Sequence, residues 1–132
     1  MNSTTGIYHV YFDDDLQAIV MEWNGYATSN EFREGTELML NTLIQHRCSR
    51  VLADIREMTL IGQEDQKWVE HIFLPRAKKF GFTEIAIVRP KAYFNKVAVE
   101  TLSDKISRET FTLNVFDSLE EAKSWLQRSL FQ

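Results

Sequence analysis

The 132-residue chain contains a single cysteine, Cys48, so no disulfide can form within it. It also has no apolar run close to the about 18 residues that a membrane-spanning helix needs. The first six residues, 1–6, include neither a basic nor an apolar segment, so we expect no secretory signal peptide. These absences favour a soluble protein in a reducing compartment, and we expect it in the cytoplasm.

Basic residues are also fewer than acidic ones. The chain has 15 Lys and Arg residues against 19 Asp and Glu residues, for a formal net charge of −4. Nucleic-acid binding requires a basic stripe that neutralises phosphates, and single-strand binding adds aromatic side chains between the basic ones. The sequence has neither pattern, so we expect no nucleic-acid partner.

Glycine is scarce as well, with five residues and no cluster. The chain lacks the glycine-rich motifs that bind nucleotide phosphates, and no serine lies in a G-x-S-x-G elbow. We therefore expect no nucleotide cofactor and no enzyme of these common kinds.

Metal-binding patterns are missing too. His9, His46 and His71 do not share the spacing of metal ligands. The acidic run Asp13–Asp15 lacks the spaced oxygen ligands, the turn glycine and the terminal glutamate of an EF-hand loop. It is better explained as a turn of Asx residues, so we expect no metal site.

The residues that are present predict an α/β domain. With 44% hydrophobic residues, a chain of this length can bury a core without a disulfide or a metal. Two β-rich runs, 7–12 and 16–23, flank the acidic turn and predict an antiparallel hairpin. Further apolar runs predict strands at 51–55, 84–89 and 111–116.

Two capping boxes mark the starts of helices. Thr28 and Glu31 open a predicted helix over about 29–46, and Ser118 and Glu121 open a short one through Leu126. Apolar spacing predicts further helices over about 63–80 and 93–107.

One proline lies inside the predicted helix over 63–80. Pro75 removes a helical hydrogen bond and clashes with the carbonyl of His71, so we expect a kink or a break near Phe73 and Leu74. Gly81 is expected to end this helix.

The predicted element order is ββαβαβαβα. Helices between apolar strands imply crossover connections, and therefore a mostly parallel sheet with an antiparallel N-terminal strand. The chain shows no linker or repeat, so residues 1–132 are expected to form one domain.

Polar residues at the ends of two predicted strands are the candidates for ligand binding. Asp54 and Arg56 lie at the carboxyl end of a central strand, where open α/β sheets place their ligand sites. Arg89, Lys91 and Tyr93 lie between the next strand and a helix, where two cations and helix-start amides suit an anion. The structural alternatives are that Asp54 bonds to loop amides or pairs with an arginine, and that the basic turn is simply solvated.

The chain resembles the STAS fold of bacterial anti-sigma-factor antagonists, and specifically the SpoIIAA-like group of small stand-alone proteins. The resemblance covers nearly the whole chain and is carried by residues 22–25, 51–54, 85–88 and 116–126. It implies a STAS-like fold and a non-enzymatic regulatory or binding role. The group is also related to the lipid-binding Sec14 fold.

In regulatory STAS proteins, a partner kinase phosphorylates a serine that opens the helix after the central strand. The corresponding stretch here, residues 62–65, contains no serine. Glu64 and Asp65 lie there instead, and acids at a helix N-terminus are favourable. We take both as candidates for an interaction surface, and their mimicry of a phosphorylated state as a hypothesis.

The sequence thus predicts a binding domain that acts through a protein partner or an apolar, lipid-like ligand between a helix and the sheet. A lipid would use Arg89 and Lys91 as head-group contacts. A protein partner would use an exposed apolar patch around Trp23 and Pro75, and such a patch serves a homodimer equally well. The alternative is an enzyme with a polar site around Asp54, Arg56 and Arg89.

Overall fold

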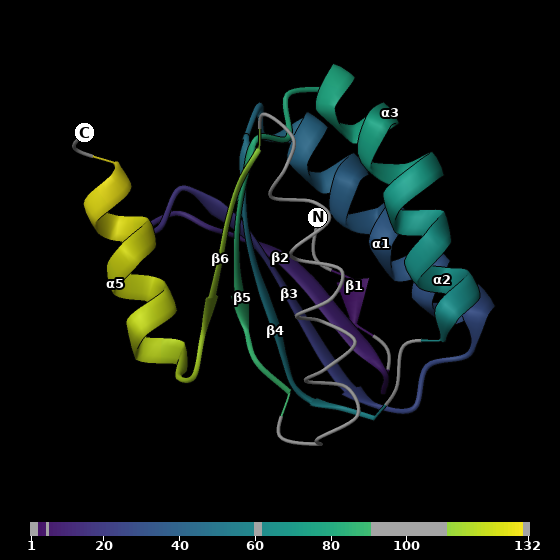
Figure 1. Ribbon diagram of the computed structural model, residues 1–132. Coiled ribbons are helices and arrows are strands. Elements are labelled where there is room, and N and C mark those ends of the chain that lie inside the picture. Colours follow the sequence, from purple (N-terminus) through teal and green to yellow (C-terminus); the bar gives the residue numbers. More distant parts are fainter. Residues whose placement is uncertain (1–2, 5, 60–61, 91–110, 131–132) are drawn as a thin grey trace.

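A six-stranded sheet with the strand order β1-β2-β3-β4-β5-β6 lies at the centre of the protein (Figure 1). The computed structural model describes residues 3–4, 6–59, 62–90 and 111–130. Adjacent strands are antiparallel from β1 to β3 and parallel from β3 to β6. The predicted α/β architecture with an antiparallel N-terminal strand is confirmed, whereas the edge strand β1 was not predicted. The strands are β1 (Ser3–Thr4), β2 (Tyr8–Asp13), β3 (Ala18–Gly25), β4 (Arg50–Met58), β5 (Glu84–Val88) and β6 (Thr112–Phe116).

The acidic run forms the turn of the predicted hairpin. Asp13 Oδ1 accepts a hydrogen bond from the Leu16 N–H at 3.1 Å, and the Gln17 side chain donates to the Asp14 carbonyl at 2.7 Å. This turn sets the register in which Tyr8 pairs with Trp23. Side-chain hydrogen bonds to the local backbone therefore account for the acidic residues, as expected of Asx residues in turns.

Helices cover both faces of the sheet (Figure 1). One face carries α1 (Ser29–Gln45) and a continuous helical segment made of α2 (Gln63–Trp68), the π-helical turn η1 (Val69–Phe73) and α3 (Leu74–Lys79). The other face carries α5 (Leu119–Ser129). The predicted helix over 93–107 lies outside the described residues.

The predicted caps explain where two of these helices begin. Thr28 Oγ1 accepts the Glu31 N–H at 3.2 Å, and the Glu31 carboxylate accepts the Thr28 N–H at 3.0 Å. Ser118 Oγ accepts the Glu121 N–H at 3.2 Å at the start of α5. Both helix starts follow from local sequence, because each cap satisfies amides that lack a partner within the helix.

The irregularity expected near Pro75 takes the form of the π-helical turn. The Leu74 N–H donates to the Val69 carbonyl, five residues earlier, and α3 starts directly afterwards with Pro75 in its first turn. A wider turn at this point accommodates the proline ring without breaking the helical segment. The predicted position is correct, and Gly81, with a φ of +96°, ends the segment as expected.

Two apolar cores lie on opposite faces of the sheet. The larger one packs β2–β4 against α1, η1 and α3, and the smaller one packs β3–β5 against α5. Residues along β4 alternate between them, with Val51 and Ala53 in the larger core and Leu52 in the smaller one. Asp54 therefore extends from the same face of the sheet as Leu52.

Candidate functional site

A partly open cavity of about 110 Å³ lies within the larger core. Strands β3 to β6 form its floor, and α1, η1 and the start of α3 form its roof. Among the described residues that line it, none is charged, and the polar side-chain groups are the Thr36 hydroxyl and the indole N–H of Trp23. The cavity is thus an apolar space between helices and sheet, which is where the sequence analysis placed an apolar ligand.

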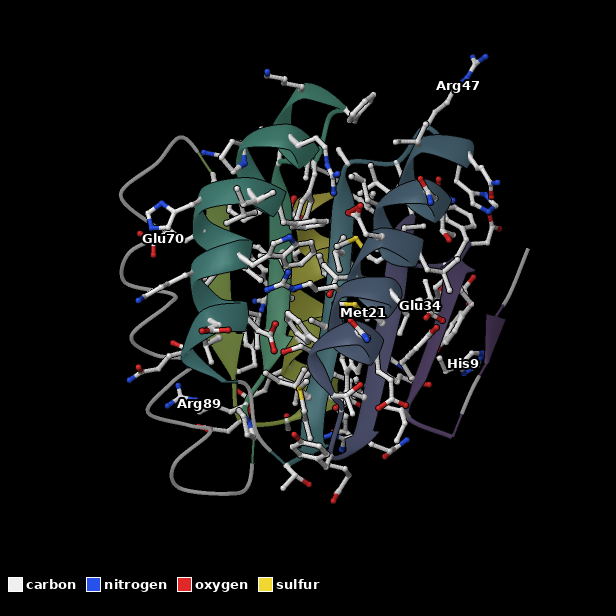
Figure 2. The ribbon with its side chains drawn as sticks, turned by 90° about the vertical axis from the view of Figure 1, so that its right-hand side faces the viewer. His9, Met21, Glu34, Arg47, Glu70 and Arg89 are labelled. Carbon is white, nitrogen blue, oxygen red and sulfur yellow. The ribbon has the colours of Figure 1, made fainter. Side chains whose placement is uncertain are left out.

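Three methionines line this cavity: Met21 from β3, Met39 from α1 and Met58 from the end of β4. In Figure 2, which views the molecule from the side that carries α1 to α3, Met21 overlaps α1, and the residue is 7% exposed. Methionine side chains are flexible and polarisable, so they adapt to the shape of a neighbouring group. The walls of the cavity can therefore adjust to a guest.

Trp23 also lines the cavity, and the prediction that it contributes to an exposed surface is wrong. Its side chain is 2% exposed, and its ring packs against Tyr8 and Phe32. The position near the end of a strand suggested exposure, but α1 crosses directly over it. Gly35 of α1 allows this approach, because a Cβ there would lie 2.6 Å from the Trp23 ring.

Thr36 contributes a hydroxyl to the cavity. The residue is 4% exposed, and Oγ1 has no hydrogen-bond partner within the part of the chain that the structure describes. Buried polar atoms are nearly always paired, so an unpaired one calls for a physical explanation. No sequence pattern singled out this residue, since a lone threonine inside a helix carries no motif.

Asp54 and Arg56 form a separate polar site on the face of the sheet that carries α5. Two nitrogen atoms of the Arg56 guanidinium, Nε and Nη2, donate to the Asp54 carboxylate at 2.9 and 2.8 Å, and the Arg56 backbone N–H adds a third bond at 3.3 Å. The hydrogen bond to Asp54 raises the pKa of Arg56. Asp54 is buried, and its charge is met by an arginine two residues away, as the structural alternative proposed.

This pair continues a row of polar side chains across three strands. Glu22 of β3 lies beside Asp54 in register, and His9 of β2 lies beside Glu22, with Nδ1 and Oε1 3.2 Å apart. Burial raises the pKa of nearby Tyr11, and the charges of Glu22, Asp13 and Asp54 add to the effect. The row thus consists of two pairs of ionisable side chains, His9 with Glu22 and Arg56 with Asp54.

Arg89 is not part of that row. Its Nε lies 3.2 Å from Asp117 Oδ1, after the end of β6. Figure 2 shows Arg89 and His9 at opposite sides of the molecule. The strand register places Val88, the residue before Arg89, beside Asp54. Lys91 and Tyr93, the other two predicted anion contacts, lie outside the described residues.

The two acids at the start of α2 have different surroundings. Glu64 is exposed, whereas Asp65 is 6% exposed and bonds to α1. Its carboxylate accepts hydrogen bonds from Ser29 Oγ at 2.9 Å and from Arg33 Nε at 3.3 Å. The prediction of an interaction surface is wrong for Asp65, because its contacts hold two helices of the same chain together.

Comparison with known proteins identifies the family. The model of the SpoIIAA-like family matches residues 18–127. The chain belongs to the SpoIIAA-like family. A solved structure with the same fold is that of an uncharacterised protein of the DUF3478 family from Shewanella loihica, described as having a SpoIIAA-like fold. The two share 16% identity over 96% of this chain and 98% of that one, with a TM-score of 0.63. No curated protein matches the sequence.

Membership of the SpoIIAA-like family gives a context for the start of α2. Residues 62–65 do open the helix after β4, which is where the resemblance to regulatory STAS proteins expects a phosphoacceptor serine. The buried Asp65 takes a structural contact there instead. Within the described ranges, no helix has the length and apolar character of a membrane span, and no group of three or more His, Cys, Asp or Glu side chains is placed to hold a metal ion.

Proposed function

We propose that this SpoIIAA-like protein is a non-enzymatic binding domain whose ligand is a small apolar molecule held between the helices and the sheet. The observation that carries the proposal is the apolar cavity under α1 and η1. Well-packed interiors contain few spaces larger than a water molecule, and each one forfeits contacts. A ligand that fills the space restores those contacts.

The volume of the cavity favours a ligand smaller than the lipid-like molecule expected from the sequence. Pockets for drug-sized molecules measure about 300–1,000 Å³, and a lipid needs a comparable volume. An apolar cavity of about 150 Å³ takes benzene. A volume of about 110 Å³ therefore suits a single ring or an aliphatic molecule of similar size.

A catalytic role for the polar row is less well supported. Arg56 neutralises Asp54 through a two-point contact, and Asp117 lies beside Arg89, so these charges are engaged within the chain. A catalytic acid or base would instead need a shifted pKa and a side chain that a substrate can reach. We accordingly place the function in the cavity.

The experiment is an NMR titration of protein labelled with ¹³C at the methionine methyl groups, with toluene as the apolar probe. Saturable shifts of the Met21, Met39 and Met58 signals are expected, because these three side chains line the cavity. Native mass spectrometry of freshly purified protein, followed by denaturing extraction, would show whether a ligand of this size is retained. Toluene at saturation that leaves all three signals unmoved would refute the proposal.

A second candidate function is the binding of a protein partner on the outer side of the helical segment 63–79. The observation that favours it is the exposure of Ile72 and Phe80, at 56% and 53%, on either side of Pro75. Exposed apolar side chains that form a patch are typical of interaction surfaces. Replacing both with serine is expected to abolish pull-down of such a partner while leaving the toluene titration unchanged.

A further inference from the structure

The hydroxyl of Thr36 indicates which class of ligand suits the cavity. A buried hydroxyl inside a helix usually donates to the carbonyl four residues earlier. Thr42 of the same helix does this, with Oγ1 2.7 Å from the Leu38 carbonyl. The equivalent acceptor for Thr36 is the Phe32 carbonyl, yet the Thr36 hydroxyl makes no hydrogen bond with any described residue. Thr36, unlike Thr42, is among the residues that line the cavity, and of the two it is Thr36 whose hydroxyl has no partner among the described residues.

Water is a poor partner for this hydroxyl. An ordered buried water typically makes about three hydrogen bonds, and the lining described here offers it two polar side-chain groups, the Thr36 hydroxyl and the Trp23 indole N–H. A charged ligand is equally unsuited, because none of the described lining residues carries a charge that would balance an ion. What remains is a neutral molecule that is apolar over most of its surface and carries one hydrogen-bonding oxygen.

We infer that the cavity binds a compact neutral ring compound with one hydroxyl or carbonyl group, whose oxygen hydrogen-bonds to Thr36 Oγ1. This inference rests on the proposed function, since it names the ligand class for the same cavity. The ring fills the space among Met21, Met39 and Phe73, and the single oxygen meets Thr36, the described lining residue with a side-chain oxygen. The threonine hydroxyl both donates and accepts, so it serves an alcohol or a carbonyl.

The test compares phenol with toluene, two molecules of nearly the same size that differ in a hydroxyl. Their dissociation constants are measured by the methionine-methyl titration for the natural protein, for Thr36→Val and for the control Thr42→Val. The ratio of phenol affinity to toluene affinity is expected to fall about three- to tenfold in Thr36→Val, the usual range for loss of one hydrogen bond. It is expected to stay within about twofold in Thr42→Val, whose hydroxyl is already bonded to Leu38.

Stability of the ligand-free protein gives an independent measurement. Thr36→Val removes an unpaired buried hydroxyl and should raise the melting temperature, whereas Thr42→Val removes a formed hydrogen bond and should lower it. Equal losses in the two variants would show that the Thr36 hydroxyl is already paired, and would overturn the inference.

The results of these experiments test the ligand class and the apolar binding site separately. Toluene binding with a phenol-to-toluene ratio that Thr36→Val leaves unchanged would overturn the ligand class and leave the apolar binding site standing. Failure of both probes to bind the natural protein would overturn the binding site itself, and the ligand class with it.

Discussion

At the scale of single residues, Gly35 decides how closely α1 approaches the sheet. A Cβ at this position would lie 2.6 Å from Trp23 Cη2 and 3.1 Å from Tyr8 Cδ2. Glycine inside a helix costs about 1 kcal/mol relative to alanine. That cost is offset here, because the close approach lets α1 cover Trp23.

Gly35→Ala is expected to lower the free energy of unfolding by about 1–3 kcal/mol, because the added methyl group overlaps a buried ring and its gain in helix propensity is smaller. Urea unfolding measures the change. Gly6→Ala is the control, since a Cβ there meets nothing within 4 Å. A Gly35→Ala protein as stable as the control variant would contradict the close contact.

At the scale of elements, the start of α2 is attached to α1 by a buried acid. Asp65 accepts hydrogen bonds from Ser29 and Arg33, and the Arg33 guanidinium also lies over the Trp68 ring, 5.3 Å from its centroid. The helical segment that begins with α2 and continues into the roof of the cavity is therefore joined to α1 by a charge-assisted contact as well as by apolar packing.

Asp65→Ala is expected to lower the free energy of unfolding by about 1–3 kcal/mol, because it leaves the partners of a buried carboxylate without an acceptor. Glu64→Ala, at the exposed neighbouring position, should change it by less than about 0.5 kcal/mol. Chemical denaturation of both variants makes the comparison. If the two substitutions had equal effects, the contact of Asp65 with α1 would be of no structural importance.

At the scale of the whole molecule, Arg50 joins segments that are far apart in the sequence. It is 8% exposed at the start of β4. Its guanidinium donates to Glu84 of β5 at 3.3 Å, to the carbonyl of Leu16 in the hairpin turn, and to Leu126 and Ser129 of α5. One side chain thus connects the sheet, the hairpin and the helix on the second face.

Arg50→Met is expected to lower the free energy of unfolding by about 3–5 kcal/mol, because it leaves Glu84 as an uncompensated, largely buried charge. Arg50→Lys should recover only part of this loss, since an ammonium group cannot reproduce the planar set of donors. Hydrogen exchange should also show faster exchange of the α5 amides in both variants. Arg128→Lys, on the exposed side of α5, serves as the control. An Arg50→Lys protein with the same free energy of unfolding as this control would contradict the connecting role of Arg50.

The local structure could largely be predicted from the sequence. The cap at Thr28, the turn at Asp13–Asp15, the buried strand around Val51 and the irregularity at Pro75 were all correctly placed. Each depends on hydrogen bonds or steric conflicts between residues a few positions apart, and those are visible in the order of the residues. The order of strands and helices in turn carried the resemblance to the SpoIIAA-like family.

The candidate site depended on contacts that sequence order does not show. The burial of Trp23 follows from the path of α1 across the sheet, and the role of Asp65 follows from its distance to Ser29 and Arg33. The unpaired hydroxyl of Thr36 is defined by what surrounds it after packing. Sequence periodicity determines which face of an element turns inward, but only the packing of all the elements decides where space remains between those faces.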